Sequence, residues 1–216
     1  MRKVLGLALA CVAGVQVIFG QSPGRSAQPT PAAPGQRSEV RVPFRAGELL
    51  TYDVSYSSYV TAGTVTMNVQ SKRPSYNSVA YYVVAEARPT PLVSKLYTLF
   101  YKADVLMDVY TLLPQRASVY SEEGQRHQMK VTTFSDSARK ATFENVTAKS
   151  GRREFSVPAF TQDALSAIYV IRALPLKVRS RETIPVSTGG RSYRAQVSVE
   201  GTEALTSLTP EAIRAR

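Results

Sequence analysis

Apolar and polar residues alternate along residues 50–60, and the same period of two returns along residues 64–69. Successive side chains of a β-strand point to opposite faces, so this alternation predicts two strands that are each buried on one side. The Ala62-Gly63 step between them is typical of a tight turn, and it predicts that the two strands pair as a hairpin. A domain that opens in this way is constrained to start from an antiparallel sheet.

Strand-like segments continue along most of the chain, and short turn sequences separate them. Residues 79–87 are dense in β-branched and aromatic side chains, which favours a central strand. Residues 122–125 and 188–190 are typical hairpin turns. One short helix is expected between these strands, on an apolar face formed by Leu92, Leu96, Leu99 and Phe100.

The period changes at residues 158–175, where apolar residues recur at helical spacing. Thr161 can cap the start of this segment and Pro175 ends it, so we expect an amphipathic helix over about residues 161–174. Its apolar stripe predicts that it packs against the sheet, through Leu165, Ile168, Tyr169, Ile171 and Leu174.

Roughly nine or ten strands with short connections and one late helix predict a mainly β fold. The expected architecture is a curved antiparallel sheet or an incomplete β-barrel, with the helix packed on one face. The strand–helix alternation of a Rossmann-type fold is not seen.

The first 20 residues begin with Arg2 and Lys3 and continue as an uncharged, mostly apolar run. This layout predicts a secretory signal peptide, with an uncleaved membrane anchor or lipidation at Cys11 as the alternatives. Residues 21–41 are rich in Pro, Ala, Ser and Gly and are expected to form a flexible linker. Residues 42–216 then form a single β-rich domain, exported to the periplasm or cell envelope.

The chain carries 27 Lys and Arg residues against 16 Asp and Glu residues, a formal net charge of +11. A basic protein can bind nucleic acid, anionic lipid or acidic glycan. Export argues against nucleic acid, so lipid, lipopolysaccharide or an envelope protein is the expected partner. The basic residues are scattered, however, and solvated strand faces explain them as well.

Signatures of catalysis are missing from the sequence. His127 is the single histidine and Cys11 the single cysteine, which rules out a site with several histidines or cysteines around a metal. His127 lies on an alternating strand segment, where a solvent-facing position is expected. The chain has no G-x-S-x-G motif, no phosphate-binding glycine loop and no dinucleotide fingerprint. We therefore expect a protein that is not an enzyme and has no cofactor.

The first hairpin and the late helix supply most of the candidate residues for structural or ligand contacts. The alternation places Tyr52, Val54 and Tyr56 toward a core or lumen, with Asp53 and Ser55 outward. On the helix, Asp163 suits the positive end of the helix dipole, and Tyr169 belongs to the apolar stripe.

Arg172 lies on or beside that stripe, and a buried arginine needs a carboxylate or several carbonyl groups as partners. We expect it to anchor the helix to the sheet through Asp53, Asp108 or Glu86. The alternative is that Arg172 meets an anionic headgroup at the mouth of a β cavity.

Three blocks resemble a known family when they are taken in order: FRAGELLTYDVSYSSYVTAGTVTMNV (44–69), LVSKLYTLFYKADVLMDVYTLLPQR (92–116) and VPAFTQDALSAIYVIRALPL (157–176). Together they are similar to the bacterial family called domain of unknown function 3108. The resemblance covers about residues 42–200 and includes Asp108, Asp163, Tyr169 and Arg172. It implies an exported cell-envelope protein with a predominantly β domain and no established reaction. The ending SLTPEAIRAR departs from the family's expected glycine and aromatic residues, which suggests a shortened C-terminus.

Two functions are compatible with these observations. The first is a non-catalytic β-shell that binds a hydrophobic or amphiphilic envelope ligand, by analogy of fold with periplasmic lipoprotein carriers. The second is a structural or scaffolding interaction module that is tethered at the membrane.

Overall fold

The computed structural model describes residues 37–57, 60–147 and 151–202. The expected signal peptide, most of the expected linker and the C-terminal residues 203–216 lie outside the described residues. The described part contains ten β-strands and two α-helices. None of its helices is long and apolar enough to cross a membrane.

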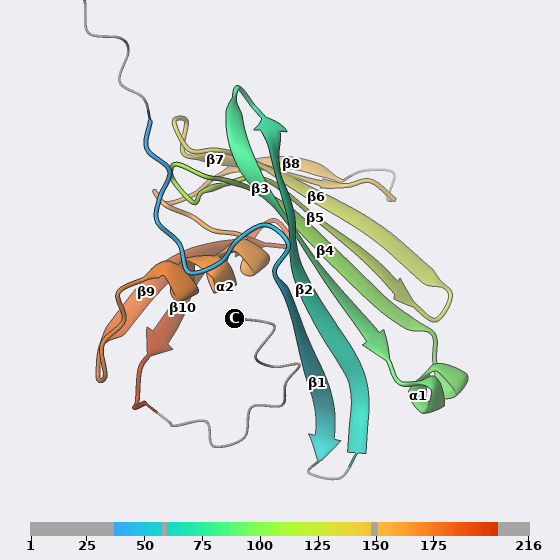
Figure 1. Cartoon of the computed structure of the whole chain (residues 1–216). Helices are drawn as coiled ribbons and strands as arrows, with labels where there is room; N and C mark the ends of the chain where they lie inside the picture. The colour runs from blue at the N-terminus through green and yellow to red at the C-terminus, as the bar shows by residue number, and fades with distance from the viewer. Residues whose placement is uncertain (1–36, 58–59, 148–150, 203–216) are drawn as a thin grey trace, which may run out of the picture. The chain divides into compact units, whose positions relative to one another are not determined.

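Eight strands form one antiparallel sheet in which every strand pairs with its neighbour in sequence (Figure 1). The sheet is not closed, so the first and the eighth strands are its two edges, and the expectation of a curved or incompletely closed antiparallel sheet is confirmed. The strands are β1 (Leu49–Ser57), β2 (Val60–Ser75), β3 (Ser78–Pro89), β4 (Leu99–Asp108), β5 (Pro114–Glu123), β6 (Arg126–Ser135), β7 (Lys140–Asn145) and β8 (Arg152–Ser156).

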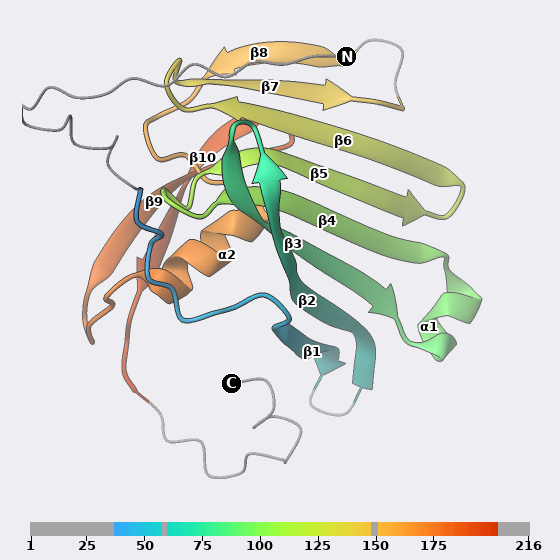
Figure 2. The same ribbon diagram turned by 45° about the horizontal axis from the view of Figure 1, so that its top comes forward.

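The expected late helix is α2 (Ala164–Ala173), and it packs against one face of this sheet (Figure 2). Leu165 and Tyr169 join a core cluster that includes fully buried residues of the central strands. Those residues follow one row across the sheet, because the strand registers align Val69 with Val83 and Val83 with Val105. The core therefore sits between α2 and the middle of the sheet.

The last two strands, β9 (Arg181–Thr188) and β10 (Arg191–Ser198), form a separate antiparallel hairpin. It buries Ile184 and Val186 against Ala167 of α2. A parallel bridge from Gln162 to Val186 ties the residue before the helix cap to the same hairpin. Helix α2 consequently lies between two layers, with the large sheet on one side and the hairpin on the other.

The N-cap of α2 is Asp163, and the prediction of Thr161 as the cap is wrong. The Asp163 carboxylate accepts hydrogen bonds from the backbone N–H groups of Leu165 and Ser166, and the Ser166 hydroxyl accepts one from the Asp163 backbone. This reciprocal arrangement is a capping box, which satisfies backbone donors that have no partner within the helix. Thr161 instead donates its hydroxyl to the carbonyl of Pro158.

The first hairpin reverses earlier in the chain than the sequence pattern suggested. Ser57 pairs with Val60, so the reversal falls between these residues rather than at Ala62-Gly63. Gly63 lies inside β2 and is needed for packing, because a Cβ atom there would stand 2.6 Å from the Arg88 carbonyl oxygen. A glycine in an alternating pattern therefore marked a close strand contact and not a turn.

The short helix α1 (Pro91–Leu96) also differs from its expected extent. Leu99 and Phe100, which were assigned to its apolar face, are the first residues of β4. The helix buries no residue, and Leu92 and Leu96 are exposed. Pairing of β4 with β5 outweighs a helical pattern that has nothing to pack against.

A substitution at Met107 tests whether α2 covers the centre of the sheet. Its side chain is fully buried in the core cluster, so Met107→Ala should lower the free energy of unfolding by about 2–5 kcal/mol in urea denaturation. Val119→Ala is the matched control, because Val119 lies on the same face and is 37% exposed, and it should cost less than about 1 kcal/mol. Equal losses in the two variants would contradict the placement of the core.

Candidate functional site: an open apolar face

The face of the sheet that packs on α2 is only partly covered. One row across it joins Val69, Val83 and Val105, all fully buried, to Ala117. Four residues away along β2, β3 and β4, a parallel row joins Val65, Ala87 and Tyr101 to Tyr52 of β1, and Tyr52 is 48% exposed. Figure 2 shows α2 over one end of the strands, away from α1 at the other end. The exposed fraction of the side chains on this face therefore increases along the strands with distance from α2.

We call the uncovered part the open face. It carries apolar side chains from five neighbouring strands, and Tyr52, Val54, Tyr101 and Val119 are exposed on it. Three alanines fill its middle, because Ala85 pairs with Ala103 and Ala87 pairs with Tyr101. The open face is defined by Tyr52, Val54, Val65, Ala85, Ala87, Tyr101, Ala103 and Val119.

Tyr101 is held in place at the far side of the open face. Its hydroxyl donates a hydrogen bond of 2.5 Å to Glu123 Oε1. This bond to a carboxylate raises the pKa of Tyr101, with desolvation as a smaller cause. The ring is therefore fixed by its polar tip while its apolar edge stays exposed.

Tyr52 lies at the boundary between the open face and the helix. Tyr52 and Val54 lie on the core-facing side of β1, as the alternation predicted, but both are exposed and not buried, and so are Asp53 and Ser55. Strand β1 is an edge of the described sheet, where it pairs on one side only, with β2. The side chain of Tyr56 lies outside the described residues.

Arg172 forms a bidentate ion pair with Glu48, at 2.6 Å for Nη1–Oε1 and 3.0 Å for Nη2–Oε2. An anchoring carboxylate was expected, but the suggested partners Asp53, Asp108 and Glu86 are wrong. The pair is largely removed from water, with 9% of the Glu48 side chain and 28% of the Arg172 side chain exposed. The hydrogen bond to Glu48 raises the pKa of Arg172 above its ordinary value.

An aromatic cluster surrounds this pair. Phe44 meets Tyr169 edge to face at 4.9 Å and Tyr81 at 5.3 Å between ring centroids. The Arg172 guanidinium lies 5.2 Å from the Tyr169 ring centroid and 5.6 Å from that of Phe44. Burial raises the pKa of Tyr169 to about 12, so its hydroxyl stays protonated. These contacts join the segment before β1 to α2 and the sheet.

Asp108 organises the turn between β4 and β5. Its carboxylate accepts hydrogen bonds from the backbone N–H groups of Tyr110 and Thr111 and from the Ser78 and Gln115 side chains. The side chain is buried but its oxygens are fully engaged. Asp108 therefore serves the fold, and so do Asp163 and Arg172.

Sequence reasoning missed three residues that shape this region: Glu48, Tyr101 and Val119. Glu48 precedes β1, and nothing in the local pattern marks it as the partner of a residue 124 positions later. Tyr101 and Val119 were available from the strand alternation, but only the sheet register sets them beside Ala87 and Ala103.

The described part of the chain shows no gathering of three His, Cys, Asp or Glu side chains that could hold a metal ion. His127 is exposed on β6, where its Nδ1 lies 3.9 Å from Glu122 Oε1. This is the solvent-facing strand position that the sequence predicted for it.

Comparison with known families and proteins gives one match. A family model described as "Protein of unknown function (DUF3108)" matches residues 51–214, which is most of the chain. No curated protein matches, and no solved structure matches.

The ion pair of Arg172 with Glu48 should stabilise the fold. Arg172→Leu leaves a nearly buried carboxylate without its cation, and should lower the free energy of unfolding by about 3 kcal/mol in urea denaturation. The double variant Glu48→Leu with Arg172→Leu should recover much of this loss, because it removes the uncompensated charge as well. A loss below about 1 kcal/mol in the single variant would contradict the role of Arg172 as an anchor.

Asp163 should make stability depend on pH. Burial raises the pKa of its carboxyl above 3.8, although the capping hydrogen bonds act in the opposite direction. The folded state then binds the proton more tightly than the unfolded state, so this group's contribution is largest below about pH 3.8 and is lost as the pH rises through the folded pKa.

The variant Asp163→Asn separates this effect from the other carboxyls. The free energy of unfolding of the wild type minus that of Asp163→Asn should fall as the pH rises from the acid side through the folded pKa. Urea denaturation at a series of pH values measures the difference. A difference that rises with pH would mean that the capping hydrogen bonds outweigh burial.

Proposed function

This chain belongs to the DUF3108 family, whose description assigns no function, and we propose that it is a non-catalytic β-shell that binds a hydrophobic or amphiphilic ligand of the cell envelope on its open face. The observation that carries the proposal is the contrast along one sheet face. Val83 and Val105 are fully buried there, while Tyr52 is 48% exposed and Tyr101 is 37% exposed. Contiguous apolar surface of this kind is typical of binding sites.

The composition of the open face suits an acyl chain or another slender apolar group. Ala85, Ala87 and Ala103 have only a methyl group each, whereas the tyrosines on either side of them are large. A floor of small side chains between two aromatic rings can take up apolar surface, at about 25 cal/mol for each Å² removed from water. Tyrosine also tolerates the boundary between an apolar group and water, because its hydroxyl can stay hydrated.

Export to the envelope remains part of the proposal and rests on the charged and apolar layout of residues 1–20. The formal net charge of +11 supports a ligand or a surface with anionic groups. We also propose that the protein is not an enzyme, because its buried acidic residues Asp108 and Asp163 are engaged in structural hydrogen bonds. The Asp108 carboxylate holds a turn and the Asp163 carboxylate caps a helix.

Tyr52 and Thr51 offer a matched test, because both are exposed on β1 but point to opposite faces of the sheet. Tyr52→Glu places a charge on the open face and should weaken binding of the fluorescent amphiphilic probe 1-anilinonaphthalene-8-sulfonate at least about tenfold. Thr51→Glu adds the same charge to the other face and should leave the affinity for the probe close to that of the wild type.

Native mass spectrometry of the protein purified from membranes gives a second measurement. Lipid should co-purify with the wild type and with Thr51→Glu, and should be lost from Tyr52→Glu. Equal probe binding in all three proteins, together with no retained lipid, would contradict the proposed ligand site.

A scaffolding module is the second candidate, and the edge strand β1 favours it. Its residues 51–55 are exposed, and within the described sheet it pairs on one side only, with β2. An unpaired edge can accept a strand from another protein. Retention of one defined envelope protein that is lost when Asp53 is changed to Pro, without any lipid binding, would favour this role over the first.

A further inference from the structure

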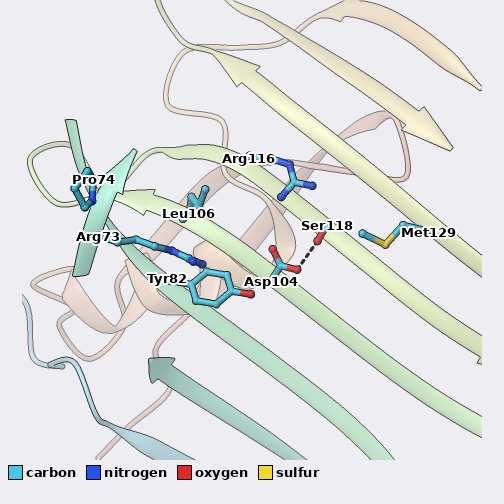
Figure 3. Close-up of a pocket in the computed structure, with 8 residues that line it drawn as sticks. All are labelled: Arg73, Pro74, Tyr82, Asp104, Leu106, Arg116, Ser118 and Met129. Atoms are coloured by element: carbon cyan, nitrogen blue, oxygen red, sulfur yellow. Dashed lines mark hydrogen bonds between the residues drawn. The ribbon is translucent and has the colours of Figure 1, made fainter. Parts of the chain in front are cut away.

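The opposite face of the large sheet contains a hollow with a volume of about 410 Å³ (Figure 3). Asp104 of β4 lines it, and the neighbouring residues in sequence, Ala103 and Val105, point to the face that α2 covers. The hollow is thus separated from the open face by the thickness of the sheet. Its lining residues are Arg73, Pro74, Tyr82, Asp104, Leu106, Arg116, Ser118 and Met129.

Two arginines give the hollow its positive charge. The Cζ atom of Arg73 lies 3.3 Å from the ring centroid of Tyr82, so this guanidinium is stacked on the tyrosine (Figure 3). Arg73 comes from β2, and Arg116 comes from β5, three strands further along the sheet. Neither guanidinium forms an ion pair with a carboxylate of residues 37–57, 60–147 or 151–202. Arginines with free planar donors are suited to bidentate binding of a phosphate group.

Asp104 adds an acceptor beside these donors. Its Oδ1 accepts a hydrogen bond from the Ser118 hydroxyl, and Figure 3 shows the two side chains side by side. Its other oxygen has no hydrogen bond within the described residues, so it can accept one from a ligand hydroxyl. Leu106 and Met129 supply apolar contacts around this polar group. With two guanidiniums and one carboxylate, the lining has a formal charge of one positive unit.

We propose that this hollow binds a phosphate group that carries a hydroxylated substituent, such as a sugar phosphate. The phosphate lies against Arg73 and Arg116, and a hydroxyl of the substituent donates to Asp104. The volume falls within the range of small-molecule sites, about 300–1,000 Å³. The carboxylate favours a ligand with hydroxyl groups, because a neutral hydroxyl donates to Asp104 without placing a second negative charge beside it. The same chemistry occurs in soluble sugar phosphates and in phosphoglycerol lipid headgroups.

Isothermal titration of the full chain with glucose 6-phosphate, inorganic phosphate and glucose tests the proposal. Glucose 6-phosphate should bind more tightly than either of the other two compounds, which each carry half of the recognised chemistry. Arg116→Gln and Arg73→Gln should each weaken its binding at least about tenfold. Arg126→Gln is the control, because this substitution removes the same charge from a residue outside the hollow. Arg126 is exposed at the start of β6.

The titrations include one further variant, Asp104→Asn, and thermal melting serves as the folding control. Asp104→Asn should reduce the preference for glucose 6-phosphate over inorganic phosphate, since it removes the carboxylate that accepts the hydroxyl. Melting curves confirm that each variant is folded, and Arg116→Lys, which keeps the charge without the planar fork, should still lose most of the binding.

Vesicle sedimentation separates the two sources of the ligand. Vesicles that contain phosphatidylglycerol should retain the protein better than vesicles with phosphatidylserine, which have the same charge but no glycerol hydroxyls in the headgroup. Binding to the sugar phosphate alone supports the hollow with a soluble ligand, and a preference for phosphatidylglycerol alone supports it with a lipid headgroup.

Two outcomes would overturn the proposal. One is the absence of both glucose 6-phosphate binding and a preference for phosphatidylglycerol. The other is an equal loss of binding in Arg126→Gln and Arg116→Gln, which would mean general charge attraction. Tyr52→Glu, on the other face, should leave this binding unchanged, so failure here is distinguishable from failure of the proposed function.

Discussion

The packing of α2 on the central strands is the contact on which the rest of this domain depends. An eight-stranded meander that does not close exposes both of its faces, so one face needs cover before it can form a core. Leu165 and Tyr169 provide that cover over Val83 and Val105. The capping box at Asp163 fixes where the helix begins, and thereby which strand positions it covers.

Helix α2 (ten residues) runs across the strands near one end of the large sheet, so it covers only part of the length of each strand (Figure 2). Burial therefore ends partway along each strand, and the same alternating pattern continues into solvent. Tyr52 and Tyr101 are exposed for this reason, although they occupy the core-facing side of their strands. The open face is therefore the part of this sheet face that α2 does not cover.

The polar residues of the domain fall into two groups with different consequences. Asp108, Asp163 and the pair of Arg172 with Glu48 are engaged inside the fold, and they hold a turn, a helix cap and a helix-to-strand contact. Arg73 and Arg116 are presented by strands on the outer face, without a carboxylate partner among the described residues. A ligand gains more from the second group, because its donors do not have to break an existing ion pair.

The period of two in the sequence determined the mainly β fold, and the change to helical spacing determined the late helix. Both patterns are local properties of neighbouring residues. Local pattern also placed His127 on a solvent-facing strand. It could not place Tyr52 in solvent, Gly63 within a strand or Glu48 beside Arg172, because each depends on contacts between residues far apart in the chain. Only the tertiary structure decided where α2 lies on the sheet, because that depends on contacts between residues far apart in the chain, and this position separates the buried core from the open face.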